Sequence, residues 1–481
     1  MSRAAAATVS FGTLQTHRWL NTGRIVLAAV LAAALTACAQ QGKVDRGDEP
    51  GQGQPGAEII ELDSDRAPPT SEELEPQPDG PGTGEVELTP PDGVAARHKV
   101  AILLPLSGPR HELGNAMLQA AQLGLFDTAG ENFALIVRDT EGTAEGAEAA
   151  AREAVDAGAE LILGPIFSKS VEAVTPVAQS AAVPVMAFSN NRKVARPGVY
   201  VLGWLPSEQV ERVLGYAVSQ GLRRFAVLAP SNDYGDLIVN AMETSARRLG
   251  GELARVAYYD ATSPDVSAPI KRLSDYEERR AALRQRIAQL ENQGTAAARG
   301  ELEELKTMDA LGSAPFDAVM VPTGGKELQT IAPTLPFYDV DPDEVRFLGT
   351  AQWNDPSLGT EPALIGGWFA APSPDGWNSF KTRYNRTFGS VPPRLVSLAY
   401  DATALAALLA RRAANDDTRE PGKPVYDPAT LTMASGFAGV DGVFRMRQDG
   451  LVERRYAVME MQRNALKVLD PAPTDFRTLT Y

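Results

Sequence analysis

The chain has 481 residues, a formal net charge of −15, three histidines and a single cysteine. One thiol can neither close an internal disulfide nor build a multi-cysteine zinc site. The composition is acidic, with no basic cluster beyond short helical runs, and this excludes a nucleic-acid-binding domain. We expect neither a metal nor a cofactor.

Residues 1–37 predict a secretory signal peptide. Three arginines and no acidic residue accompany an apolar run at 25–35, which is shorter than the roughly 20 residues that a membrane-spanning helix needs. The run ends in Leu35-Thr36-Ala37-Cys38, which resembles the lipobox of bacterial lipoproteins. We therefore expect Cys38 to carry a lipid anchor; a buried spare cysteine or an ordinary signal peptide is the alternative. An Asp directly after the lipidated cysteine would resemble an inner-membrane retention signal. Residues 39–41 contain no Asp, so we expect the anchor to lie on the periplasmic side of the outer membrane.

Residues 38–96 predict the lipidated cysteine and a disordered acidic tether. Positions 39–96 contain nine prolines, nine glycines and no aromatic residue, and their 14 acidic side chains outnumber three basic ones. Such a segment cannot bury enough apolar surface to offset the entropy that ordering would cost. Most of the acidity of the chain therefore belongs to the tether and not to the folded body.

Residues 97–481 repeat one α/β pattern twice. The first copy predicts strands at 100–104, 133–138, 160–163, 183–188 and 199–204, and the second at 225–229, 252–258, 317–321, 345–349 and 367–371. Helical segments such as 143–157 and 169–181 separate most of these strands. Short buried strands that alternate with helices are typical of parallel sheets with right-handed crossovers. We therefore expect an α/β fold of two doubly wound parallel-sheet lobes, since the chain is too long for one core.

The segment 271–311 interrupts this pattern. It is highly charged, carries apolar residues at helical spacing, and has Gly294 and Gly300 near its middle. We expect a helical hairpin inserted before the strand at 317–321. The hairpin is either a solvated excursion or an arm on which a partner docks.

The last part of the body predicts one helix and a pair of strands. Leu398, Ala402, Leu405 and Leu409 share one helical face. Strands are expected at 443–447 and 456–461, around a turn at Asp449-Gly450.

The sequence offers little to a catalytic mechanism. His17 lies in the signal peptide, His98 precedes the first strand and His111 lies in a turn, while the only thiol is assigned to the anchor. Gly324-Gly325-Lys326 resembles the end of a phosphate-binding loop, but the earlier glycine of that motif is missing. We expect that the protein is not an enzyme.

Four stretches of the body resemble type I periplasmic binding proteins of the leucine/isoleucine/valine-binding kind. They are HKVAILLPLSGPRHELGNAMLQAAQLGLFD, LILGPIFSKSVEAV, VPVMAFSNN and VYVLGWLPSEQVERVLGYA. Together with the lipobox, the tether and the charged hairpin, they look more like the penicillin-binding-protein activator lipoproteins, which share that fold. The resemblance implies three crossings between lobes, near Leu205, Pro372 and Gly436. Lobe 1 would then comprise 97–205 and 373–436, and lobe 2 would comprise 206–372 and 437–470.

The resemblance also implies a ligand cleft between the lobes, at the carboxyl ends of the strands. The candidate ligand-binding residues at matching positions are Ser107, Gly108, Ser168, Ser170, Ser189, Asn190, Tyr234, Trp353 and Asn354. Several of these residues could instead have structural roles. Ser168 and Ser170 would suit the cap of a helix that begins near Val171, Ser107 would suit a turn, and Trp353 would suit a core.

Two functions follow from the resemblance. The first is a lipid-anchored regulator of peptidoglycan synthesis that contacts a class A penicillin-binding protein. The alternative is a periplasmic receptor that binds an amino acid or a small peptide for a transporter. The basic pair Arg192-Lys193, at a place where transport proteins carry small hydroxylic residues, favours the regulator.

Overall fold

The computed structural model describes residues 98–476, except positions 131, 264, 294 and 421. The expected signal peptide, the lipidated Cys38 and the acidic tether lie outside the described residues. Within residues 98–476, apart from those four positions, no helix is long and apolar enough to cross a membrane.

Lobe 1 is built on a five-stranded sheet in the order β2-β1-β3-β4-β5, in which every pairing is parallel. Its strands are β1 (His98–Leu104), β2 (Phe133–Asp139), β3 (Leu161–Leu163), β4 (Val185–Ala187) and β5 (Val199–Val201). The side chains from Val100 to Leu104 are fully buried, as expected for a central strand that is covered on both faces.

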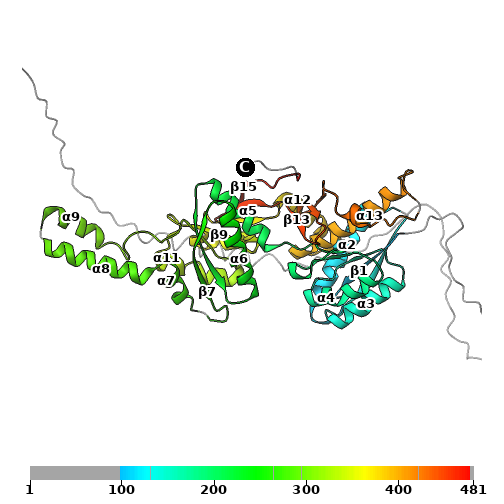
Figure 1. Cartoon of the computed structure of the whole chain (residues 1–481), viewed down its shortest axis with the longest axis horizontal. Coiled ribbons are helices and arrows are strands. Elements are labelled where there is room, and N and C mark those ends of the chain that lie inside the picture. Colours follow the sequence, from blue (N-terminus) through cyan, green and yellow to red (C-terminus); the bar gives the residue numbers. More distant parts are fainter. Residues whose placement is uncertain (1–97, 131, 264, 294, 421, 477–481) are drawn as a thin grey trace, which may run out of the picture. The chain divides into compact units, whose positions relative to one another are not determined.

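Helices cover both faces of this sheet (Figure 1). The helices of lobe 1 are α2 (His111–Thr128), α3 (Ala144–Asp156), α4 (Ser168–Ser180), α12 (Pro374–Phe388) and α13 (Ser397–Ala414). Helices α2 and α13 pack on the face that carries Val100, Ile102 and Leu104, while α3 and α4 pack on the opposite face. The buried side of α3 consists of alanines, which allow a close approach to the sheet.

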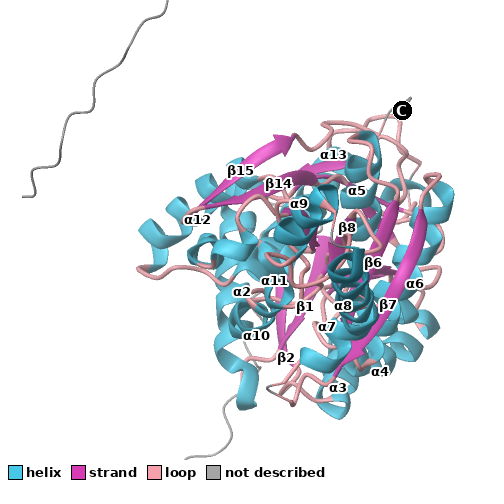
Figure 2. Ribbon diagram, turned by 90° about the vertical axis from the view of Figure 1, so that its left-hand side faces the viewer, coloured by secondary structure: helices cyan, strands magenta, loops and turns pink. Residues whose placement is uncertain are grey.

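Lobe 2 contains a seven-stranded sheet in the order β15-β14-β10-β9-β8-β6-β7. Its strands are β6 (Arg224–Pro230), β7 (Glu252–Tyr259), β8 (Ala318–Met320), β9 (Arg346–Gly349), β10 (Trp368–Ala371), β14 (Ala457–Gln462) and β15 (Ala465–Asp470). Strands β6 to β10 are parallel, and β14 and β15 extend the sheet in antiparallel fashion. Helices flank the strands (Figure 2): α5 (Pro206–Ser219), α6 (Asp233–Arg248), α7 (Ser267–Leu273), α10 (Gly325–Ile331) and α11 (Thr334–Phe337).

The third crossing between the lobes differs from the expectation. Strands β11 (Phe437–Gly439), β12 (Gly442–Met446) and β13 (Val452–Arg454) form a small antiparallel sheet, which belongs to lobe 1 and not to lobe 2. Phe444, Met446 and Val452 pack into the core cluster of lobe 1. The chain therefore crosses at 455–456 and not near Gly436; the other two crossings lie at 202–205 and 372–373.

The expected pairing of the last two strands was wrong for the same reason. Strand β12 pairs with β13, while the residues from Ala457 onward pair with β10 of lobe 2. The turn at Asp449-Gly450 therefore connects β12 to β13, within lobe 1.

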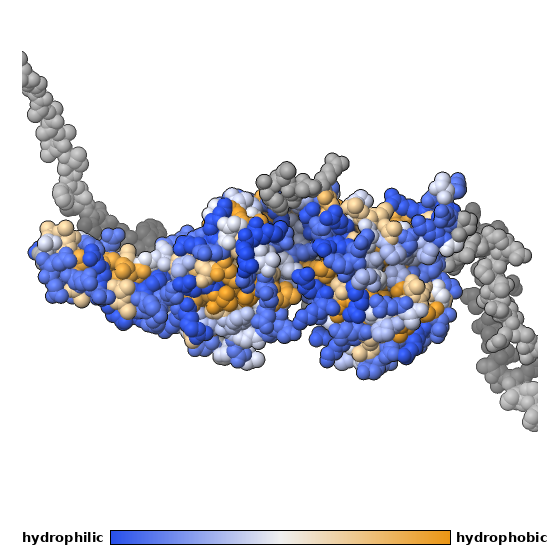
Figure 3. Space-filling view, in the orientation of Figure 1, coloured by the Kyte–Doolittle hydropathy of each residue, from blue (hydrophilic) through white to orange (hydrophobic). Residues whose placement is uncertain are grey.

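The charged segment before β8 contains a helical hairpin, α8 (Tyr276–Gln293) and α9 (Ala296–Leu305). Leu283, Leu290 and Leu305 are buried between the two helices, in a cluster that is separate from the cores of the lobes. Met308, the last apolar residue of the charged segment's helical pattern, is 42% exposed because it follows the end of α9. Figure 1 shows the hairpin extending away from the sheet of lobe 2, and in Figure 3 its surface is mostly hydrophilic.

Candidate functional site

Four of the predicted ligand residues line one cavity, which we call the lobe 1 cavity. Its volume is about 710 Å³, and its walls include Ser168, Ser170, Ser189 and Asn190. The first turns of α3 and α4 also reach this cavity. Topology brings these residues together, because the loops that follow neighbouring parallel strands emerge at the same edge of the sheet.

Two of those four side chains are already engaged within the protein. The Ser170 hydroxyl is buried and donates to the Thr143 carbonyl at 3.1 Å. The buried Ser189 hydroxyl accepts from the Asn191 amide at 3.2 Å. Ser168 and Asn190 therefore remain as the predicted residues with uncommitted side chains, and the Ser189 hydroxyl keeps its O–H as a donor.

Helix α4 adds a second feature to the lobe 1 cavity. Phe167 stands at its N-cap position, where no side chain caps the first turn. The unpaired N–H groups of a helix N-terminus attract anions through hydrogen bonds and through the helix dipole. Helix α3, in contrast, is capped by the Thr143 hydroxyl, which accepts from the Gly146 amide at 2.9 Å.

Ser107 and Gly108 have turn roles at the end of β1. Ser107 is exposed, and its amide donates to the Asp139 carboxylate at 3.3 Å. Gly108 has a φ of 74°, and a Cβ at this position would lie 2.8 Å from the Glu141 carbonyl oxygen. Neither residue lines the lobe 1 cavity.

The candidates from lobe 2 are dispersed. Tyr234 is half-buried at the start of α6, where its hydroxyl lies 3.4 Å from that of Thr350, and burial raises the pKa of Tyr234. Trp353 is fully buried and its indole N–H donates to the Val321 carbonyl at 3.0 Å, so its proposed contact with a ligand was wrong. The indole packs against Phe369 in the core of lobe 2. Asn354 follows Trp353 in a short turn and does not line the lobe 1 cavity.

Sequence reasoning missed a polar group at the carboxyl edge of the lobe 2 sheet. The Thr323 hydroxyl donates to the carboxylate of Glu327, and the nearby Tyr259 is only 2% exposed. Burial, together with the Glu327 carboxylate, raises the pKa of Tyr259. The available signal was position in the sequence, because Thr323 lies in the loop that follows β8 and Tyr259 is the last residue of β7.

A second missed group consists of buried and partly buried charges beside the first and third crossings. We call Glu208, Arg394, Asp401, Asp441 and Arg454 the crossover cluster. Arg454 is 3% exposed, and its guanidinium donates to the Leu202 carbonyl through Nε at 3.3 Å and through Nη2 at 3.0 Å. Its amide donates to the Glu208 carboxylate at 3.3 Å. Arg454 therefore connects β13 to the first crossing and to the start of α5.

Glu208 and Asp401 of this cluster have raised affinities for protons. Burial raises the pKa of Glu208 to about 8, with smaller contributions from the charges of Glu453 and Glu211. Burial, and then the charge of Asp441, raise the pKa of Asp401 to about 7. At neutral pH these two groups carry protons for a large part of the time, unlike ordinary surface carboxylates.

Two further contacts complete the cluster within lobe 1. Asp441 accepts from the Ser397 hydroxyl at 2.7 Å and forms an ion pair with Arg394 at 2.5 Å. The Arg394 guanidinium also lies between the rings of Trp204 and Trp377, at 4.9 and 4.3 Å from the two ring centroids. These contacts hold the loop before α13 against the first crossing.

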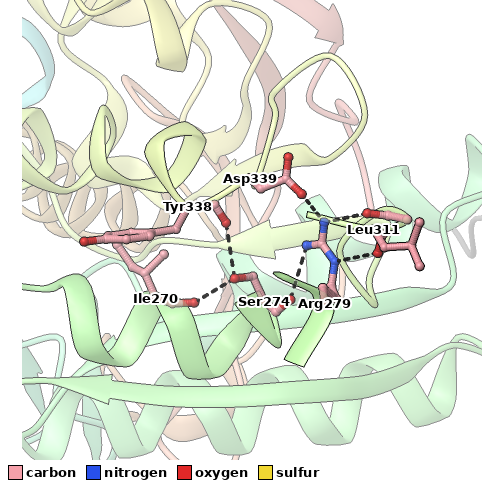
Figure 4. Close-up of polar contacts among 7 residues, drawn as sticks. Ile270, Ser274, Arg279, Leu311, Tyr338 and Asp339 are labelled. Carbon is pink, nitrogen blue, oxygen red and sulfur yellow. Dashed lines mark hydrogen bonds and ion pairs between the residues drawn. The ribbon is translucent and has the colours of Figure 1, made fainter. Parts of the chain in front are cut away.

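The base of the helical hairpin is organised around Arg279 (Figure 4). Its guanidinium donates to the carbonyls of Ser274 at 3.3 Å, Leu311 at 3.4 Å and Gly312 at 2.5 Å. It also forms an ion pair with Asp339, which lies beyond α11. Both ends of the hairpin are thereby fastened to lobe 2, and the Leu311 amide, the Lys271–Glu277 ion pair and the Tyr276–Tyr338 ring contact hold the same region.

The part of the chain that the structure describes contains no group of three or more His, Cys, Asp or Glu side chains placed to hold a metal ion. The two described histidines have local partners: His98 contacts Glu160 at 3.0 Å, and His111 contacts the Gly108 carbonyl at 2.8 Å. The arrangement offers surfaces and cavities for binding.

The sequence was compared with known families and curated proteins. The sequence model of a family described as "Periplasmic binding protein" matches residues 98–465. An uncharacterized protein of Rickettsia prowazekii is 24% identical over 178 residues, 37% of this chain and 47% of that protein. The penicillin-binding protein activators LpoA of Haemophilus influenzae and Pasteurella multocida are 26% and 25% identical over 166 residues. Those 166 residues are 34% of this chain and 28% of each activator, so the chain spans less than a third of their length.

Solved structures show the same fold. A putative branched-chain amino acid ABC transporter protein from Rhodospirillum rubrum has a TM-score of 0.61 at 16% identity, over 78% of this chain and 100% of that one. An ABC transporter substrate-binding protein from Sphaerobacter thermophilus has a TM-score of 0.58 at 17% identity, over 80% and 100% of the two chains. At these identities the similarity concerns the fold alone.

Proposed function

Because the chain belongs to the periplasmic binding protein family, we propose that it is a non-enzymatic periplasmic protein that acts by binding. We further propose that it is anchored to the outer membrane through Cys38, and that it binds and activates a class A penicillin-binding protein. The similarity to the LpoA activators supports this choice of partner.

The observation that carries the proposal is the helical hairpin. Its buried cluster is separate from the cores of both lobes, so the lobes do not need it in order to fold. Its residues line neither the lobe 1 cavity nor the larger cavity described below, so a small ligand there does not need it either. Its base is nevertheless fixed by Arg279, as suits an arm that presents a surface to another protein.

We expect that shortening the hairpin abolishes activation and leaves the body folded. The Leu311 amide donates to the Arg279 carbonyl at 3.2 Å, so a short Gly-Ser loop can replace residues 280–310 without moving the base. The affinity for the penicillin-binding protein should fall at least ~10-fold, or about 1.4 kcal/mol. Peptidoglycan polymerisation and cross-linking by the class A enzymes of the host, with and without the mature chain, measure the effect.

The matched control is Arg411→Gln/Arg412→Gln, which changes two exposed charges of α13 and leaves the hairpin intact. Thermal unfolding should show that the melting temperature of the body is unchanged in both variants. If the shortened protein still stimulates the enzyme as the wild type does, the hairpin is not the docking arm. If the wild type binds none of the class A enzymes, the proposed partner is wrong.

A receptor function is the second candidate, and the lobe 1 cavity favours it. The uncapped start of α4, with Ser168 and Asn190, is suited to hold the carboxylate of an amino acid or a small peptide. A ligand at 100 times its Kd should stabilise the protein by about 2.7 kcal/mol. We expect a rise in melting temperature with a cognate amino acid or peptide, and a reduced rise in Ser168→Ala. An unchanged rise in that variant would remove Ser168 from the site.

A further inference from the structure

A larger cavity lies at the crossings; it shares Asn190 with the lobe 1 cavity and is also lined by Tyr234. We call it the crossover cavity; its volume is about 1050 Å³. Lobe 1 contributes residues 190–193 and the end of β13, and lobe 2 contributes the facing sides of α5 and α6. Pockets of this volume accommodate ligands of the size of a short peptide or a nucleotide.

The walls of the crossover cavity carry a small formal excess of positive charge, although the chain as a whole is strongly acidic. Seven arginine and lysine side chains line the cavity against five aspartates and glutamates. Most of these charges are paired: Arg248 with Glu211 and Arg455 with Glu453 inside the cavity lining, and Arg212 and Arg447 with Asp470 and Asp449 outside it. Glu208, whose pKa is raised to about 8 by burial, adds little negative charge at neutral pH.

Two of the cations that lobe 1 contributes form no ion pair with a described residue, whereas Arg447 and Arg455 of the same lobe pair with Asp449 and Glu453. Arg192 and Lys193 are exposed on the rim, and neither forms an ion pair with any described residue. They occupy a short 3₁₀ turn, in which the Asn191 side chain accepts a hydrogen bond from the Lys193 amide at 3.0 Å. This contact uses the main chain of Lys193 and not its side chain. Their side chains are therefore free to turn toward a ligand without disturbing the turn.

The floor of the cavity holds a buried polar group with unused hydrogen-bonding capacity. Arg454 and Tyr456, both at least 97% buried, line the cavity. The Nη1 atom of Arg454 has no hydrogen-bond partner among the described residues. Burying such a group without a partner costs about 1–3 kcal/mol, so a ligand that supplies an acceptor would recover part of that cost.

We propose that the crossover cavity is a second ligand site, for an anion that carries at least two carboxylate or phosphate groups. One group would lie between Arg192 and Lys193 at the rim, and the other would approach the Arg454 floor. Apolar side chains such as Leu205, Leu237 and Leu451 would cover the part of the ligand between them. The site is independent of the proposed penicillin-binding-protein partner.

Such a ligand would favour one arrangement of the two lobes over the others. It would contact the rim of lobe 1 and the α5–α6 wall of lobe 2 on either side of the first crossing. A ligand that bridges these walls binds one arrangement of the lobes more tightly than the others, and it shifts their population accordingly. The expected consequence is that the ligand stabilises the whole body and not one lobe alone.

The test is calorimetric titration of the mature full-length chain with two probes, tetraglutamate and tripolyphosphate. Tetraglutamine serves as the uncharged reference. We expect at least one anionic probe to bind, with an affinity that falls as the salt concentration rises. The double variant Arg192→Gln/Lys193→Gln should weaken that binding at least ~10-fold. Its melting temperature without ligand should match that of the wild type, because neither side chain has a partner to lose.

The matched control is Lys169→Gln, which removes an exposed cation from the lobe 1 cavity. We expect this variant to bind the probe as the wild type does. Preferential binding of tetraglutamate would identify an acidic peptide as the ligand class, and preference for tripolyphosphate would identify a phosphorylated compound. Three results would overturn the proposal: neither anion binds, tetraglutamine binds equally well, or the double variant binds with undiminished affinity.

Discussion

Replacing Arg454 by alanine is expected to destabilise the body by about 3–5 kcal/mol, because it removes a buried guanidinium and leaves its buried acceptors without a donor. Arg454 is 3% exposed and donates twice to the Leu202 carbonyl. Its positive charge lowers the proton affinity of both Glu208 and Asp401, which lie buried nearby. The variant would lose the two hydrogen bonds, the compensating charge and the contact with the Phe444 ring.

Urea denaturation followed by circular dichroism measures this loss as a lower midpoint. The control is Arg447→Ala, which removes an arginine from the turn before β13. The Arg447 side chain is 55% exposed and pairs with Asp449 on the surface, so its removal should cost less than about 1 kcal/mol. Equal midpoints for the two variants would show that the crossover cluster does not depend on Arg454.

Glu208→Gln is expected to change how stability depends on pH. In the folded protein, burial raises the pKa of Glu208 to about 8 from an ordinary value of 4.5. The folded chain therefore holds this proton more tightly than the unfolded chain does. The resulting stabilisation is complete below about pH 4.5 and is lost as the pH rises to about 8, at up to about 1.4 kcal/mol per pH unit.

Glutamine mimics the protonated acid and does not titrate. The variant should match the wild type near pH 4.5 and exceed its stability at pH 8 by about 2–4 kcal/mol. Asp401, whose pKa is raised to about 7, should keep a slope of the same sign in the variant. Denaturation midpoints at several pH values, with the exposed Glu211→Gln as control, give the comparison. Parallel curves for wild type and Glu208→Gln would refute the buried, protonated Glu208.

Much of the fold could be predicted from local sequence patterns. Composition alone predicts the burial of two segments, the apolar run from Val100 to Leu104 and the alanines of α3. A strand or helix that is covered by the core has few polar residues. The hairpin α8–α9 could be predicted as well, since Leu283, Leu290 and Leu305 recur at helical spacing. The expected resemblance to binding proteins and to the activator lipoproteins is confirmed by the comparisons.

The candidate site could be predicted only in part. Ser168 and Asn190 do meet at one cavity, because loops after parallel strands share one edge of the sheet. The same rule placed Trp353 near the cleft, but it could not show that the indole turns inward to the Val321 carbonyl. The unusual position of Asp401 could have been noticed in the sequence, because Asp401 is the one charged residue inside the apolar stretch at 398–410.

The sequence alone therefore determined the class of the fold, the strands and helices of its repeated pattern and the presence of the hairpin, since each depends on a periodicity that neighbouring residues carry. Tertiary structure alone decided that β13 belongs to lobe 1 while the next strand joins lobe 2, because a strand pairs with whichever edge the packing leaves open. It also decided that Glu208, Asp401 and Arg454 gather beside the crossings. Burial of a charge is stable only when distant segments supply its partners, and no local pattern records which segments those are.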